Sequence, residues 1–189
     1  MTSIDICNSA LLQLGQAPIN GFDQGNIREI TAELYLEPCK RELLRKHDWS
    51  FASERATLAQ LSETPEFGWD YAYRLPVNCL AVRGVYDDES EILNYKIEQR
   101  KILCDEDTED FQIRYTKDID NYDLMDPIFT RALIHYLAYT MAMPVKADKQ
   151  IKQQEYSEYL LIMSEAKDTD SIESQSAPEL DTKWEDAGR

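Results

Sequence analysis

The stretch DPIFTRALIHYLAYTMAMP, from Asp126 to Pro144, decides the fold of this chain. Asp126 can cap a helix N-terminus with its carboxylate, and Pro127 suits the first helical position, where no backbone N–H is needed. Apolar side chains occupy nearly every side of the helix that follows, and Arg131 is its only full charge. A helix that is apolar all round is covered by other elements. The stretch therefore predicts a central buried helix that ends at Pro144.

Two helices are expected before this one. The first carries an apolar stripe and stops at Gly15, a residue that favours a helix end. The second begins at Asn26, which has capping-box spacing to Glu29, and Pro38 should kink it. Its predicted buried face consists of Ile27, Ile30, Leu34, Cys39 and Leu43. Its opposite face is the most basic part of the chain and is either solvated or a partner site.

Between Ser50 and Lys117 the hydrophobic period changes from that of a helix to that of a strand. Five short runs bounded by turns have the period of two, at residues 69–75, 80–86, 95–98, 102–104 and 111–116. A turn is expected at Gln99 and Arg100. Because no crossover helix separates these runs, we predict antiparallel pairing.

A fourth helix is expected from about Asp148 to Ala166. Beyond Lys167 the chain becomes polar and acidic, which is typical of a tail without a core of its own. The predicted fold class is α+β. It comprises a four-helix bundle of residues 1–49 and 126–167, an antiparallel β lobe inserted at residues 50–125, and an extended C-terminal tail at residues 168–189.

The charge of the chain narrows its possible partners. Its 189 residues include 36 Asp and Glu against 20 Lys and Arg, a formal net charge of -16. Such a chain repels phosphate backbones and anionic membranes, because binding them requires cations. It suits a basic protein partner, or the wall of a channel through which DNA slides. The first residues lack the basic and apolar segments of a signal peptide, so we expect none.

The residues that usually carry chemistry are scattered. Four cysteines lie far apart without a CxxC pair, and we expect them to be buried in a reduced compartment. His135 falls on the apolar helix and is expected to bond a neighbour in the core, while His47 is expected to cap a helix C-terminus. No Gly-rich phosphate loop, GxSxG or HExxH pattern occurs. We therefore predict no catalytic residue, no metal site and no cofactor.

An acidic run is the strongest remaining signal. It lies between Cys104 and Asp126, and its densest part comprises Asp105, Glu106, Asp107, Glu109 and Asp110. The run lacks the pattern of a Ca²⁺-binding loop. A pair of its carboxylates could meet the spacing of a glycosidase by chance alone, and solvated loops explain the run better than a metal or catalytic role. The use we favour is a fixed negative surface.

Four segments together resemble the head-to-tail adaptors of short-tailed phages, also called tail tubular protein A. They are ICNSALLQLGQAPI (6–19), YLEPCKRELLRKHDWSFASERATLA (35–59), FGWDYAYRLPVNCLAV (67–82) and IEQRKILCDEDTEDFQIRYTK (97–117). The helix from Asp126 to Pro144 continues the match, so the resemblance covers nearly the whole chain apart from the tail. The family commonly has Gly where this chain has Gln99, so the hairpin turn there is expected to differ in shape.

The resemblance implies a structural subunit of the virion and no enzymatic role. Such subunits form a ring of twelve copies beneath the portal protein, contact the next tail (nozzle) protein, and let the genomic DNA pass without specific binding. The subunit is made in the host cytoplasm and needs no membrane. The tail would then contact the portal or a neighbouring subunit through Pro178, Leu180 and especially Trp184, since a lone aromatic in a polar tail can fill a partner's pocket. The five acids from Asp105 to Asp110 would line the channel.

Two alternatives stay open. One is an acidic interaction module that mimics DNA and blocks a basic partner in a salt-sensitive way. The other is a hydrolase that uses the carboxylates between Cys104 and Asp126.

Overall fold

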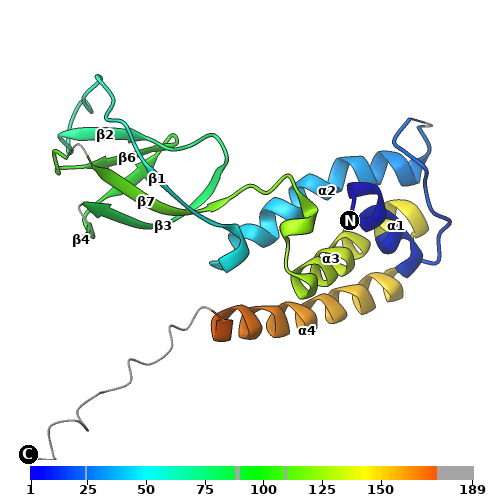
Figure 1. The fold of residues 1–189 in the computed structure, drawn as a ribbon. Helices are drawn as coiled ribbons and strands as arrows, with labels where there is room; N and C mark the ends of the chain where they lie inside the picture. Colours follow the sequence, from blue (N-terminus) through cyan, green and yellow to red (C-terminus); the bar gives the residue numbers. More distant parts are fainter. Residues whose placement is uncertain (24, 88–89, 109, 174–189) are drawn as a thin grey trace, which may run out of the picture.

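The computed structural model describes residues 1–173 apart from 24, 88–89 and 109. Its helices are α1 (Ser3–Gln13), α2 (Ile27–Arg45), α3 (Pro127–Lys146) and α4 (Lys149–Glu173). Its strands are β1 (Ser53–Thr57), β2 (Tyr71–Arg74), β3 (Cys79–Asp87), β4 (Ser90–Glu91), β5 (Lys96–Glu98), β6 (Lys101–Cys104) and β7 (Phe111–Lys117). Short 3-10 turns occur at Ser50–Ala52 and Tyr122–Leu124. The helices gather at one end of the molecule and the strands at the other (Figure 1), so the chain is α+β.

Helix α3 is the centre of the helical part, as its apolar sequence predicts. The Asp126 carboxylate accepts the backbone N–H groups of Ile128 and Phe129 at 2.7 and 2.9 Å, which fixes the helix start. Phe129, Leu133, Leu137, Met141 and further residues of this helix are fully buried. The helix does not stop at Pro144 but continues to Lys146, and Ala147 then ends it in the left-handed conformation.

The expected four-helix bundle with an extended tail is not what the chain forms. The other helices pack around α3, and α2 and α4 each make their main contact with it (Figure 1). An all-round apolar helix needs covering on every side, so it becomes the hub instead of one member of a bundle. Helix α4 also runs on to Glu173, so residues 168–173 are helical and not tail. Residues 174–189 lie outside the described part.

Helix α2 buries a different face from the predicted one. Cys39 and Leu43 are buried as expected, but Ile27, Ile30 and Leu34 are 53%, 48% and 59% exposed. The face that packs on the core carries small and polar residues instead, together with Leu36, Leu43 and Leu44. Small side chains such as Ala32 let α2 approach its neighbours closely, and this contact decides which side is covered.

The strands form two antiparallel sheets with the orders β1-β7-β3-β4 and β2-β6-β5. Antiparallel pairing is confirmed, although β1 and β4 were not predicted. Gln99 and Arg100 form the β5–β6 turn with φ of 46° and 62°, a conformation that a two-residue hairpin turn requires and that glycine adopts most readily. A second core lies between the sheets and includes Tyr73, Val85, Ile102, Phe111 and Ile113. Among the described helices, none is long and apolar enough to cross a bilayer.

Candidate functional site

The predicted channel acids lie on the segment between β6 and β7, at the end of the β lobe. Asp105, Glu106, Asp107 and Asp110 are exposed, and Glu109 lies outside the described residues. The Tyr73 hydroxyl holds the segment by donating to the Glu106 carbonyl at 3.0 Å, and the Tyr73 ring stacks on Phe111 at 3.8 Å. The acids therefore form a fixed, exposed negative patch, and the negative charge of Asp107 raises the pKa of the nearby Tyr71.

The described acids of this segment do not assemble a metal site. Within the described ranges, no group of three or more His, Cys, Asp or Glu side chains could hold a metal ion. The Asp105 carboxylate accepts the backbone N–H of Asp70 at 3.2 Å, and the Asp87 carboxylate accepts the Thr108 hydroxyl at 2.6 Å. Both bonds shape the loop and its neighbours.

Both histidines bind carboxylates of helix α4. His135 Nδ1 lies 2.8 Å from the buried Glu155 carboxylate, which agrees with the prediction of a core histidine bonded to a neighbour. His47 was expected to cap α2. Its Nε2 instead lies 2.9 Å from Asp170, whose other oxygen accepts the Ser50 backbone N–H at 2.8 Å. The two pairs attach α4 to the rest of the molecule along its length.

The basic residues of α2 bind inside the chain. Lys40 is 1% exposed and donates to the Ile119 carbonyl at 2.8 Å, with Glu37 and Asp118 beside it. Arg41 donates to Asp118 at 2.6 Å, and Arg45 donates to the Leu80 carbonyl. These contacts tie the helices to the β lobe, so this face of α2 serves internal contacts more than solvent or a partner.

An ion cluster at Asp48 joins α2 to the β lobe. Asp48 accepts a hydrogen bond from Arg114 on β7 and lies 3.8 Å from Arg83 on β3. Arg83 also donates to the Arg45 and His47 carbonyls at 3.1 and 2.6 Å, at the C-terminal end of α2. A cation at that end complements the helix dipole.

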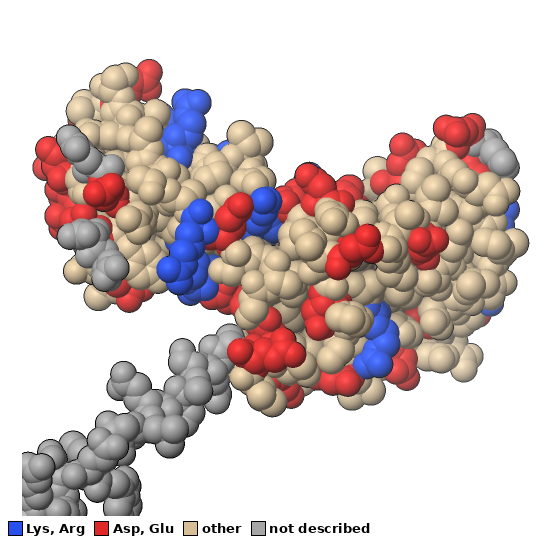
Figure 2. Space-filling view, in the orientation of Figure 1, with Lys and Arg blue, Asp and Glu red and all other residues tan. Residues whose placement is uncertain are grey.

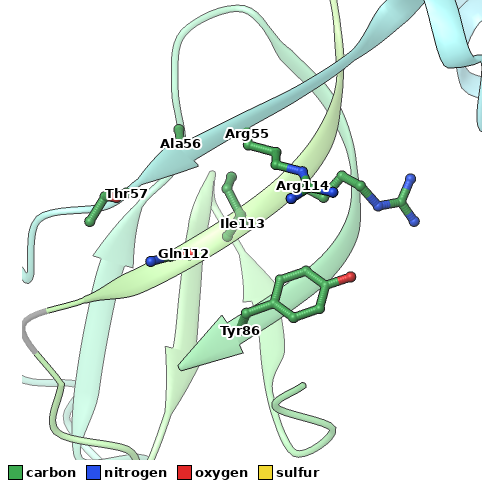
Figure 3. Close-up of a pocket in the computed structure, with 7 residues that line it drawn as sticks. All are labelled: Arg55, Ala56, Thr57, Tyr86, Gln112, Ile113 and Arg114. Carbon is green, nitrogen blue, oxygen red and sulfur yellow. The ribbon is translucent and has the colours of Figure 1, made fainter. Parts of the chain in front are cut away.

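A groove lies on the outer face of the β1-β7-β3-β4 sheet, next to this cluster. It has a volume of about 520 Å³ and is lined by Arg55, Ala56, Thr57, Tyr86, Gln112, Ile113 and Arg114 (Figure 3). Arg55 and Arg114 are direct cross-strand partners. Their guanidinium groups and the Tyr86 ring lie on the same side of the sheet (Figure 3). Figure 2 shows few Lys and Arg side chains (blue) on this face of the molecule. Much of the blue surface lies over the β lobe and its junction with the helices.

Gly84 makes room for Tyr86 in this groove. A Cβ atom at position 84 would lie 2.5 Å from the Tyr86 hydroxyl oxygen and 2.8 Å from two ring carbons. The Tyr86 ring therefore covers Gly84 and reaches Arg114. Burial lowers the pKa of Arg114, but the hydrogen bonds of Arg114 to Asp48 and to Tyr86 outweigh burial, so the pKa is raised. Tyr86 and Arg114 form a pre-ordered cationic and aromatic surface.

The sequence reasoning missed this groove because it did not recognise strand β1. Arg114 was assigned to a strand, but its partner Arg55 lies in the short run SERAT, which has only weak strand character. Exposed and half-buried residues alternate along this strand in the structure, but the polar letters SERAT show no matching apolar alternation, so the sequence held no clear signal for it.

The remaining predicted contact residues, Pro178, Leu180 and Trp184, lie outside the described part of the chain. No protein-family model and no curated protein matches the sequence.

Proposed function

We propose that this chain is a structural subunit of a phage virion, a head-to-tail adaptor that assembles as a ring between the portal protein and the tail. The observation that carries the proposal is the order of the four resembling segments between residues 6 and 117, followed by the helix from Asp126. The subunit has no enzymatic role in this account. Localisation in the virion neck and a stoichiometry of about twelve copies are parts of the same proposal.

An apolar stripe on α2 supports self-assembly. Ile27, Ile30 and Leu34 recur at spacings of three and four, and each is about half exposed. Burying such side chains between copies is favourable, at roughly 25 cal/mol per Å² of apolar surface. In a ring each copy uses two different surfaces, and we assign the stripe to one of them, with a neighbouring copy as its occupant.

The acidic patch supports a position beside DNA. Asp105, Glu106, Asp107 and Asp110 are exposed on one turn of the β lobe, and the chain has a net charge of -16. A wall of this sign repels phosphate, which lets DNA slide past without specific binding. The proposal requires these acids to face the channel of the ring.

The C-terminal residues would contact the portal. Residues 168–173 belong to helix α4, so the proposed contact segment is cut back from residues 168–189 to residues 174–189. Pro178, Leu180 and Trp184 lie in that segment. An aromatic anchor such as Trp184 is typical of residues that dominate binding energy at an interface.

Electron microscopy of the purified chain, alone and mixed with the portal protein of the same phage, tests the proposal. We expect a ring that stacks coaxially on the portal. A chain that stays monomeric and does not bind the portal protein in any condition would contradict the adaptor proposal. Salt-sensitive 1:1 binding to a basic DNA-binding protein would favour the DNA-mimic alternative instead.

A further inference from the structure

The sheet groove concentrates positive charge on a chain that is otherwise strongly acidic. Arg55 and Arg114 stand directly opposite each other on β1 and β7. Like charges in that arrangement destabilise a sheet unless an anion lies between them. Asp48 binds Arg114, whereas Arg55 is exposed and makes no hydrogen bond or ion pair within the described residues. Among the described residues, Arg55 is therefore a cation without a matching anion at the rim of the groove.

The end of helix α4 lies beside Arg114, one of the two arginines of the groove. Asp170 is held by His47 and by the Ser50 backbone N–H, three residues before the helix ends. A second cavity of about 460 Å³ is lined by Asp170 and Ser171 of α4 together with Arg114 of β7. The chain therefore leaves α4 next to the cationic groove, with 16 residues (174–189) still to follow.

The composition of those residues complements the groove. They include Glu179, Asp181, Glu185 and Asp186 against Lys183 and Arg189. In an extended peptide, side chains two positions apart point to the same side, so Glu179 and Asp181 can face the two arginines together. Trp184 can stack on a guanidinium group or on Tyr86.

We propose that the groove binds the C-terminal segment of its own chain, with Glu179 and Asp181 paired to Arg55 and Arg114. Ser171 and Arg114 line the same cavity, and the six residues from Glu173 to Glu179 add up to about 20 Å of extended chain beyond the helix. Gly84 and Tyr86 shape the floor of the site. This inference concerns the free chain and does not depend on the proposed adaptor function.

Limited proteolysis of the full-length chain tests this docking. Trypsin cleaves after Lys183, and mass spectrometry follows release of the fragment 184–189. Where cleavage needs the segment to undock, its rate follows the undocked fraction. Arg55→Glu should raise the rate about tenfold, since it replaces attraction by repulsion. Arg74→Glu is the matched control: Arg74 is also exposed on a strand, but on the other sheet, and its substitution should leave the rate within about twofold of wild type.

Further arms keep the test decisive if a variant folds poorly. In the wild-type chain, 0.5 M NaCl, a concentration chosen to screen surface pairs, should raise the rate relative to a free peptide of residues 174–189. Equal cleavage of the wild-type chain, both variants and the free peptide would overturn the proposal. So would equal acceleration by Arg55→Glu and Arg74→Glu. Protection that grows with protein concentration would overturn the same-chain assignment and place the segment in a neighbouring copy.

Discussion

Arg114 and Arg55 are cross-strand partners on β7 and β1, but only Arg114 is neutralised by Asp48. The other Asp48 oxygen is buried, faces Arg83 at 3.8 Å and accepts no hydrogen bond in the described part of the chain, so Arg114 is the closest cation to this carboxylate. Arg114→Met should therefore lower the free energy of unfolding by about 1–2 kcal/mol, because it leaves a partly buried carboxylate without its main partner. Arg55→Met is the matched control and should change it by less than about 0.5 kcal/mol. Urea unfolding at pH 7 measures both, and equal losses would contradict this assignment.

Lys40 and Arg41 provide a second matched pair. Both approach Asp118, but Lys40 is 1% exposed and Arg41 is exposed. Lys40→Met should cost about 2–4 kcal/mol, because Asp118 loses a buried cation and the Ile119 carbonyl loses its donor. Arg41→Met should cost less than about 1 kcal/mol, since solvent screens an exposed pair. Similar urea midpoints for the two variants would show that Lys40 is not the internal link between α2 and the β lobe.

Features that depend on neighbouring residues could be predicted from the sequence, whereas the buried face of α2 could not. The capping at Asn26 and Asp126, the central helix α3, the α+β class and the Gln99–Arg100 turn all follow from local chemistry and were predicted. Helix α2 carries apolar side chains on more than one side, and contact with the rest of the fold selects which of them are buried. The buried partner of Lys40 is the carbonyl of Ile119, 79 residues later, which no local pattern indicates.

Non-local contacts also explain why the predicted end of the fourth helix, near Ala166, was wrong. The segment Asp168–Asp170 looks like a polar tail, yet Asp170 binds His47, 123 residues earlier, and extends the helix. For the groove, Arg114 was recognisable as a strand residue, but its neighbour Arg55 lies on a five-residue strand that depends on pairing with β7. A short strand with a weak pattern is specified by its partner more than by its own sequence.

The contacts of Asp170 near the end of α4 predict how truncation changes the stability of the chain. Ending the chain after Lys167 removes Asp170 and its bonds to His47 and Ser50, and should lower the free energy of unfolding by about 1–3 kcal/mol. Ending it after Glu173 keeps these bonds and should change the stability by less than about 0.5 kcal/mol. Thermal unfolding followed by circular dichroism compares the two. If both truncations unfold alike, Asp170 does not anchor α4.

The four cysteines should be unreactive in the folded chain. Cys7, Cys39, Cys79 and Cys104 are all buried free thiols. Burial raises the pKa of Cys7 to about 12 and raises the pKa of the other three, so at pH 8 the reactive thiolate is scarce. Ellman's reagent should label none of them rapidly at pH 8 and all of them in guanidinium chloride. Labelling should become faster as the pH rises toward these values. Rapid reaction of one thiol in the native chain would contradict its burial.

The α2 stripe should be needed for assembly and not for folding. Ile30→Asp combined with Leu34→Asp places two charges on one exposed face, where burial against a neighbouring copy would leave them desolvated and unpaired. Leu93 is 82% exposed on the β lobe, so Leu93→Asp introduces a charge away from the stripe and serves as the control. Circular dichroism should show all of these chains folded.

Negative-stain electron microscopy of the chain mixed with its portal protein tests the adaptor proposal most directly. We expect wild-type and Leu93→Asp chains to form a ring on the portal, and the Ile30→Asp/Leu34→Asp chain to leave the portal bare. A wild-type chain that leaves the portal bare would contradict the adaptor function itself. Rings formed equally well by the stripe variant would contradict the assignment of α2 to the interface.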